Sequence, residues 1–244
     1  MSGHYLAYLN INDTISELYD SIVNGNYSYA VKLTQNLSVK NGFAITNVIE
    51  KLTQEVNSNL LSYGYKLWSS GERDIVHNYL PHSFSLIFNE GNNVVLINRR
   101  YDLALKLDAG KDSNGDRKVW GDSSDKTSRR IVWQMLPIWY NNKVYFKLKN
   151  WDCNQFLKMG LYPDDIKDRP VYGDTKHDEM RHTWYLEPVL LGDIRSFFIT
   201  NRQFSQRLKL AVSADSIGDR QLWGHNGDIN KNDLSRFLWD IKKH

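Results

Sequence analysis

Residues 115–123 read GDRKVWGDS, and two further versions of this stretch occur in the chain: DRPVYGDT at 168–175 and DRQLWGHN at 219–226. Three residue types keep their places in all versions, at intervals of 52 and 51 residues: Asp116, Asp168 and Asp219; Arg117, Arg169 and Arg220; Gly121, Gly173 and Gly224. Self-similarity at a fixed period is typical of repeat architectures. The motif therefore predicts three copies of one structural unit.

The repeat extends on both sides of the motif. LINRRYDLALKL at 96–107 aligns with LKNWDCNQFLKM at 148–159 and with ITNRQFSQRLKL at 199–210, and each copy ends near a tryptophan: Trp133, Trp184 and Trp239. Each copy holds four short segments of period two, separated by turn-forming asparagine and glycine. A propeller also has four strands per repeat, but its closure takes four to eight blades. Three repeats of four strands therefore favour a β-trefoil.

The apolar spacing before residue 88 is helical instead. Ile15, Leu18 and Ile22 follow one helix face, and Thr14 with Glu17 forms a capping box that predicts a helix start there. Pro81 ends the last helical segment because proline cannot continue a helix. The predicted fold class is therefore α+β multidomain. An N-terminal all-α helical bundle occupies residues 1–88 and a C-terminal all-β β-trefoil occupies residues 89–244, with repeats at about 93–140, 141–192 and 193–244.

The threefold motif has two interpretations. A residue that shapes a threefold barrel must occur three times, whereas one binding site needs its residues once. The aspartate, arginine and glycine of all copies are therefore predicted to be structural, holding turns and close backbone approaches. The alternative is three sugar sites, because aromatic faces and Asp side chains suit a pyranose. The third copy departs from that pattern, since His225 replaces Asp122 and Asp174.

Binding residues are expected where the copies differ. Trp139 and Tyr140 precede the Asn141-Asn142 turn, while Trp151 and the stretch Tyr162-Pro163-Asp164-Asp165 occur only in the second copy. Near the end of the helical half, aromatic residues could line an interdomain pocket, a common place for ligands. Packing in the core is the competing interpretation for all of them. The candidate ligand-binding residues are Tyr65, Trp68, Trp139, Tyr140, Trp151, Tyr162 and Asp164.

Several function classes lack support in the sequence. The chain has no G-x-S-x-G, P-loop or dinucleotide motif, and its net charge of +3 comes without the clustered Lys/Arg stripe that nucleic-acid binding needs. Asp112, Asn114 and Asp116 mimic a calcium loop, but Arg117 stands at the turn-glycine position. No run approaches the ~20 apolar residues of a transmembrane segment, and the start lacks a signal peptide. We expect no enzyme, no cofactor, no metal and no nucleic-acid partner. The single cysteine, Cys153, excludes an internal disulfide and by itself favours a reducing compartment.

Long ordered blocks of the chain resemble the thirty-kilodalton lipoproteins of moth and silkworm haemolymph, which include microvitellogenin. The blocks are SYGYKLWSSGERDIVHNYLPHSFSLIF at 62–88, VVLINRRYDLALKLD at 94–108, VWGDSSDKTSRRIVWQMLPI at 119–138, VYFKLKN at 144–150 and HTWYLEPV at 182–189. The resemblance runs from about Ile15 to Lys242. It implies a VHS-like helical domain before the β-trefoil, secretion into haemolymph despite the reducing-compartment argument, and no catalytic residues.

The resemblance also implies partners. Members of this family are described as yolk and amino-acid reserves taken up by a receptor on the oocyte or fat body, as carriers of lipid or another small apolar molecule, and as binders of glucose or glucans in defence. The Q-x-W signature of ricin-type lectins is missing here, because Ile131-Val132, His182-Thr183 and Phe237-Leu238 precede the repeated tryptophans. We therefore expect a secreted storage and transport protein, with carbohydrate binding through the β-trefoil as the alternative.

Overall fold

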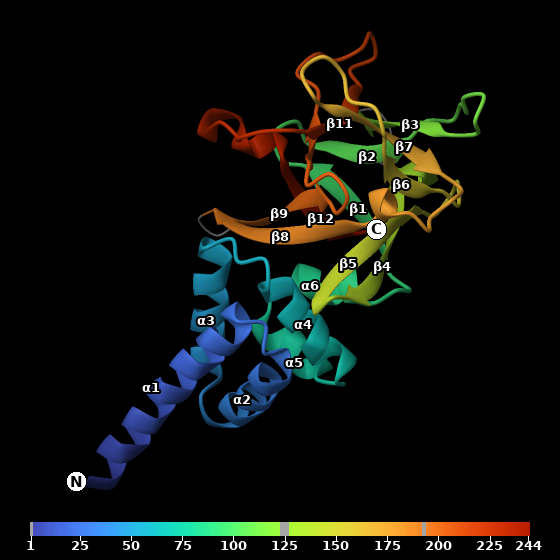
Figure 1. Ribbon diagram of the computed structural model, residues 1–244. Coiled ribbons are helices and arrows are strands. Elements are labelled where there is room, and N and C mark those ends of the chain that lie inside the picture. The colour runs from blue at the N-terminus through green and yellow to red at the C-terminus, as the bar shows by residue number, and fades with distance from the viewer. Residues whose placement is uncertain (1, 123–126, 192–193) are drawn as a thin grey trace. The chain divides into compact units, whose positions relative to one another are not determined.

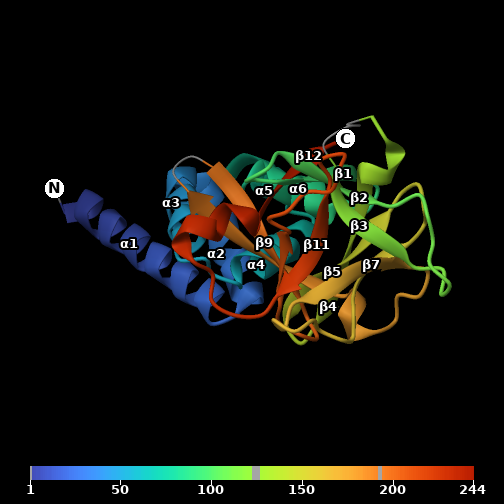
Figure 2. The ribbon, with the colours of Figure 1, turned by 90° about the horizontal axis from the view of Figure 1, so that it is seen from above.

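Helices make up the N-terminal part of the chain in the computed structural model, which describes residues 2–122, 127–191 and 194–244 (Figure 1). The helices are α1 Ser2–Val23, α2 Tyr27–Lys40, α3 Gly42–Gln54, α4 Leu60–Ser69, α5 Arg73–Tyr79 and α6 His82–Phe88. The N-terminal end of α1 extends beyond the other helices (Figure 2). Because α1 begins at Ser2, the predicted helix start at Thr14 is wrong, and Thr14 with Glu17 lies inside the helix.

The helices pack through the apolar faces that their sequences predict. Leu18 and Ile22 of α1 are fully buried, as are Ile45 and Leu52 of α3. Gly64 of α4 permits a close helix contact, because a Cβ there would lie 2.8 Å from the Phe84 ring.

Strands make up most of the remaining chain. They are β1 Asn93–Asn98, β2 Leu103–Leu107, β3 Arg117–Asp122, β4 Val132–Tyr140, β5 Lys143–Asn150, β6 Phe156–Met159, β7 Arg169–Asp174, β8 Trp184–Leu191, β9 Ile194–Asn201, β10 Arg207–Leu210, β11 Arg220–His225 and β12 Leu238–Lys243. Short 3-10 turns, η1 Arg129–Ile131, η2 Met180–His182 and η3 Lys231–Arg236, precede β4, β8 and β12.

The strand pairing has threefold order. β1, β4, β5, β8, β9 and β12 pair in a closed ring of six, and the hairpins β2–β3, β6–β7 and β10–β11 complete the sheet. β3, β7 and β11 also pair with one another, so the three copies of the motif meet around one axis. A six-stranded barrel with three hairpins is a β-trefoil-like arrangement.

The predicted fold class is wrong in its separate helical domain. The molecule is mostly one large antiparallel sheet, and the helices do not form a self-contained VHS-like bundle. The compact unit that holds them, Met1–Ser85, also includes Asn141–Val144 and Pro188–Arg195, whereas Leu86–Tyr140, Tyr145–Glu187 and Ser196–His244 form the second unit. The predicted repeat boundary at 192 and 193 lies outside the described residues.

Hydrogen bonds explain why strand residues belong with the helices. The Val144 amide donates to Ser62 Oγ of α4 over 3.1 Å, and Asn142 Nδ2 donates to the Gly25 carbonyl over 2.8 Å. Ser62 is buried, so its hydroxyl needs a partner. The start of β5 supplies it, and the sequence pattern of the helices does not reveal this.

Conserved spacing within the repeats corresponds to shared core contacts. The indole Nε1 atoms of Trp133, Trp184 and Trp239 donate to the carbonyls of Leu105, Leu157 and Leu208. All three rings are fully buried, so these bonds satisfy their polar atoms. Asn98, Asn150 and Asn201 are likewise fully buried, and each Nδ2 donates to a backbone carbonyl.

Candidate functional site

The motif aspartates bind lysines of a neighbouring repeat. Lys158 Nζ lies 2.5 Å from Asp116 Oδ2 and 2.8 Å from Asp174 Oδ2. Lys106 contacts Asp219 and Asp122 in the same way, at 3.2 and 2.5 Å. These lysines and Lys209 are 8 % exposed or less. Lys158 and Lys106 thus each join a carboxylate of their own repeat to one of the preceding repeat in the ring, and these ion pairs are buried.

The third copy keeps this arrangement with a different residue. Lys209 Nζ lies 2.5 Å from Asp168 Oδ2, and His225 takes the place of the second carboxylate. Its Nδ1 lies 3.0 Å from both Lys209 Nζ and Asp168 Oδ1. The substitution that separates this copy from the others therefore lies inside a structural cluster, where its ring contacts groups of the protein.

The motif arginines hold the hairpin loops that precede β3, β7 and β11. Arg117, Arg169 and Arg220 donate through Nη1 to loop carbonyls, those of Asp108 and Ala109, Gly160 and Leu161, and Ala211 and Val212. Two guanidinium groups also stack on an aromatic ring of the next repeat, Arg169 on Phe204 at 3.9 Å and Arg220 on Tyr101 at 4.0 Å.

The motif glycines lie where neighbouring hairpins approach closely. A Cβ on Gly121 would lie 2.5 Å from Leu210, and one on Gly173 would lie 2.7 Å from Leu107. Gly224 faces Met159 in the same way. A larger residue at these positions would have to displace the facing leucine or methionine side chain. The groups of the motif are thus used in contacts between repeats.

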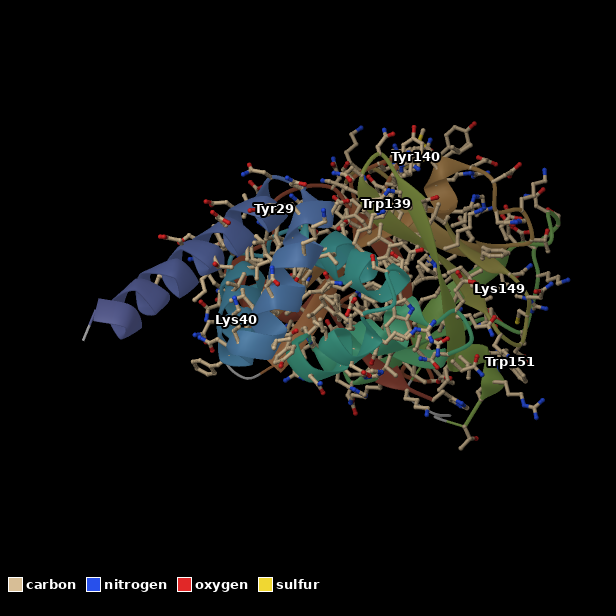
Figure 3. All side chains as sticks on the ribbon, turned by 90° about the horizontal axis from the view of Figure 1, so that it is seen from below. Tyr29, Lys40, Trp139, Tyr140, Lys149 and Trp151 are labelled. Atoms are coloured by element: carbon tan, nitrogen blue, oxygen red, sulfur yellow. The ribbon has the colours of Figure 1, made fainter. Side chains whose placement is uncertain are left out.

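The candidate ligand-binding residues lie at several separate places. Tyr65 and Trp68 are on α4 and are half-buried. The Trp68 ring contacts the His77 ring edge-on, and the Arg73 guanidinium lies 5.1 Å from the centre of the Trp68 ring. Trp139 and Tyr140 end β4, and Arg202 lies 3.9 Å from the Tyr140 ring. Trp151 follows β5, well away from Trp139 and Tyr140 (Figure 3). Within the second compact unit, Trp151 therefore does not share a site with Trp139 and Tyr140.

Tyr162 and Asp164 lie together in the loop before β7, with different surroundings. Tyr162 is 83 % exposed. Asp164 Oδ1 accepts the amides of Ile166 and Asp168, and Asp112 and Asp215 accept equivalent amides in the other two copies. Asp164 thus has a turn-closing role that all three copies share, although its neighbour Asp165 made the stretch look unique in the sequence.

A pocket of about 370 Å³ adjoins the first hairpin loop, residues 108–116 between β2 and β3, and none of the predicted ligand residues lines it. Its lining comprises Asp108, Gly110, Lys111, Asp112, Asp116, Lys118 and Tyr172. Four of these positions carry other residue types in the second and third copies: Asp108 aligns with Gly160 and Ala211, Gly110 with Tyr162 and Ser213, Lys111 with Pro163 and Ala214, and Lys118 with Pro170 and Gln221. The difference between copies was the signal that could have found this pocket.

Two titratable groups of this pocket have shifted pKa values. Burial acts to raise the pKa of Asp108, but hydrogen bonds from Gly110 N and Trp120 Nε1 outweigh it, and the pKa lies below its ordinary value. Burial raises the pKa of Tyr172, and the charges of Asp112 and Asp116 raise it further. At neutral pH Tyr172 therefore keeps its hydroxyl proton and can donate a hydrogen bond, whereas the Asp108 carboxylate can accept one.

A groove of about 390 Å³ lies within the helical unit, between α1 and α3. It is lined by Ile15, Ser16, Tyr19, Asp20, Asn47, Val48 and Lys51. Lys51 Nζ lies 3.9 Å from the centre of the Tyr19 ring, and Tyr19 donates its hydroxyl hydrogen bond to Glu55 Oε2 over 2.7 Å. Ile15 was assigned to a helix face in the sequence, and the groove beside it has no sequence signal of its own.

Within residues 2–122, 127–191 and 194–244, no group of three or more His, Cys, Asp or Glu side chains is placed to hold a metal ion. Among the same residues, no helix combines the length with the apolar character that crossing a bilayer requires.

Comparisons with known proteins identify the family. The family model described as lepidopteran low molecular weight (30 kD) lipoprotein matches residues 12–243. Low molecular mass lipoprotein 3 of Bombyx mori is 37% identical over 233 residues, which are 95% of this chain and 90% of that protein. Microvitellogenin of Manduca sexta is 37% identical over 229 residues, 93% of this chain and 91% of that protein.

A solved structure supports the strand arrangement. The crystal structure of the SDF2-like protein from Arabidopsis thaliana aligns with 62% of this chain and 92% of its own, with a TM-score of 0.51 at 12% identity. At that identity the likeness concerns the fold alone. The sequence comparisons, in contrast, cover almost the whole chain and confirm the resemblance drawn from its ordered blocks. The chain belongs to the lepidopteran low molecular weight (30 kD) lipoprotein family.

Proposed function

We propose that this protein is a secreted storage and transport lipoprotein of the haemolymph that holds a lipid or another small apolar molecule and is taken up through a receptor on the oocyte or fat body. Its family membership supports a lipoprotein role, and the name of its relative microvitellogenin supports a yolk reserve. The proposal assigns the protein no catalysis.

The groove between α1 and α3 is the proposed cargo site. Its volume of about 390 Å³ lies within the range of small-molecule pockets. Ile15 and Val48 offer apolar contact area, and Lys51 places an ammonium group at the same groove. An amphiphile with an acyl chain and an anionic head matches this pairing, because the chain loses water contact while the head gains a cation. The coincidence of an apolar wall and one cation in a lipoprotein carries the proposal.

Oleate titration tests the cargo site. The Ile15→Asn variant should weaken oleate binding about tenfold, and Lys51→Gln should weaken oleate more than oleyl alcohol, which lacks the anionic head. Phe43→Asn is the matched control, because Phe43 is an exposed apolar residue of α3 that does not line the groove. Equal oleate affinity in all variants would exclude the groove. Native mass spectrometry of protein from its source should show a bound lipid.

Carbohydrate binding through the β-trefoil-like part is the second candidate, and the pocket beside the first hairpin loop favours it. Tyr172 supplies an aromatic side chain, and Asp108 and Asp112 supply carboxylates. A hexose needs such a combination, because its apolar face packs on a ring while its hydroxyls bind charged groups. The pocket occurs where the copies differ, which is the behaviour expected of a single site.

Glucose and glucan titrations test this second candidate. Lys118→Ala should weaken binding, whereas Gln221→Ala, which changes the equivalent position of the third copy, should leave it unaltered. The aromatic residues named from the sequence supply a contrast: loss of binding in Trp139→Ala, Trp151→Ala or Tyr162→Ala, with none in Lys118→Ala, would move the sugar site away from this pocket. No binding by any form would remove the carbohydrate role.

A further inference from the structure

Two of the three hairpin loops expose apolar side chains. We define the first, second and third hairpin loops as residues 108–116, 160–168 and 211–219. In the second loop Leu161, Tyr162 and Ile166 are 45, 83 and 71% exposed, and in the third Val212 and Ile217 are 65 and 68% exposed. These five are nearly half of the eleven large apolar side chains exposed among the residues that the structure covers. Such clustering marks an interaction surface.

The turn geometry does not require these apolar residues. All three loops close alike, with the amides of Asp112, Asp164 and Asp215 donating to the carbonyls of Asp116, Asp168 and Asp219 at 2.8 to 2.9 Å. Yet the first loop has Ala109, Gly110 and Asn114 where the second has Leu161, Tyr162 and Ile166. The same backbone thus folds with small or polar side chains at its tip, so the apolar set serves another purpose.

The loop backbones are already hydrogen-bonded internally. In the second loop the Gly160 amide donates to Pro170 O at 2.8 Å, and the Lys167 amide donates to Asp164 O at 3.0 Å. Arg169 donates to the Leu161 carbonyl, and Asp164 Oδ1 accepts two loop amides. The third loop repeats these contacts through Arg220 and Asp215. The amides of Gly160, Asp164, Ile166, Lys167 and Asp168 thus have partners, which lowers the cost of taking these groups out of water.

We propose that the second and third hairpin loops insert their apolar side chains into the interfacial region of a lipid surface. The exposed apolar tips match the boundary between headgroups and acyl chains of a lipid surface, which takes up apolar side chains at shallow depth. Charge indicates which lipid: the second loop carries Asp164, Asp165 and Lys167 around its tip, and the third carries Asp215. Both tips are therefore net acidic, which favours zwitterionic over anionic lipid. This inference rests on the proposed lipid role, because a carrier must meet a lipid surface to exchange cargo.

Vesicle co-sedimentation of the full chain tests the proposal. Phosphatidylcholine vesicles should retain the protein, and replacing one third of the lipid with phosphatidylserine should weaken retention. Leu161→Ser with Tyr162→Ser and Ile166→Ser should weaken partitioning at least about tenfold, and Val212→Ser with Ile217→Ser should weaken it by a smaller factor. Val39→Ser with Phe43→Ser removes two exposed apolar residues from the helices and is the control that should retain binding.

A gain of function makes the test independent of folding defects. Ala109→Leu with Asn114→Ile gives the first loop the apolar residues of the second and should strengthen vesicle binding. Equal vesicle binding by all variants would overturn the loop proposal. So would a result in which the chain binds no vesicles and its loops bind a second protein instead. Oleate titration of the loop variants separates the two proposals: unaltered oleate binding with lost vesicle binding leaves the groove in place, whereas vesicle binding without oleate binding contradicts only the groove.

Discussion

Lys158 donates to Asp116 across the junction between the second and first repeats, with 2.5 Å between Nζ and Oδ2. Lys158 also holds Asp174 at 2.8 Å, and all three side chains are largely buried. One ammonium group therefore compensates two carboxylates. Removing a single partner from such a cluster leaves charge without compensation in a medium that solvates it poorly.

Lys158→Met should accordingly lower the free energy of unfolding by about 3 to 5 kcal/mol. The methionine preserves most of the packing volume, so the loss reports charge rather than a cavity. Urea denaturation measures it, and Lys143→Met, which alters an exposed lysine of β5, is the control expected to change stability by less than about 0.5 kcal/mol. Equal stability of the two variants would show that the lysines do not join the repeats.

Lys167→Gly should stabilise the protein by about 1 kcal/mol. Lys167 has a φ of 69° at the loop position where Gly115 and Gly218 have φ of 84° and 91°. Glycine adopts this left-handed conformation without the Cβ clash that lysine suffers. The Gln206 side chain binds the Lys167 carbonyl, which glycine retains. Thermal unfolding checks the gain, and Gly115→Ala is the converse variant, expected to lose a similar amount; stabilisation by both would contradict the conformational argument.

Residue periodicity made the strand part of the fold predictable. The spacing of Asp116, Asp168 and Asp219 revealed the threefold order because each copy must make the same contact with its neighbour. The ordered blocks around them predicted the family correctly. In the helical part, only the presence of helices was predictable. Its packing with the strand ends uses Ser62 and Asn142, and contacts of such polar residues produce no periodic pattern in the sequence.

The candidate sites, like the fold, were predictable from the sequence only in part. That binding residues lie where the copies differ is still a prediction, and applying it to single conspicuous aromatics selected Trp151 and Tyr162 rather than a pocket. The pocket at the first loop depends on Asp108 and Lys118, which are unremarkable in sequence and come together with Tyr172 only through the pairing of β3 with β7. Contacts between strands far apart in the sequence form such a site, and the residue pattern of one sequence does not predict those contacts.

Cys153→Tyr should stabilise the protein by about 0.5 to 1 kcal/mol. Cys153 aligns with Tyr101 and Phe204, the residues on which Arg220 and Arg169 stack. The corresponding cation here is Arg117, whose charge acts on the half-buried Cys153 thiol. An aromatic ring at this position would complete the third stack. Urea denaturation of Cys153→Tyr and of the reverse variant Phe204→Cys should move in opposite directions, and destabilisation of both would contradict the predicted stacking.

His182→Phe should remove part of the acid sensitivity of the fold. His182 is fully buried in η2, where the other copies have Ile131 and Phe237, and its Nε2 lies 3.5 Å from Asp174 Oδ2. Burial lowers the pKa of His182, although the charge of Asp174 opposes it and Arg181 and Lys158 add to it. In the unfolded chain the histidine pKa is about 6.5, so His182 binds a proton more readily there than in the folded chain.

The sign of the effect follows from that difference. Stability contributed by neutral His182 is fully present above about pH 6.5 and is lost as the pH falls from there toward the lower pKa of the folded state. Unfolding free energies of the wild type and His182→Phe, measured from pH 7.5 to 5, should diverge only below about pH 6.5, with the variant losing less. Because Asp174 and the other titrating groups are present in both proteins, their difference isolates His182. Parallel curves over the whole range would mean that the buried ring does not take up a proton on unfolding.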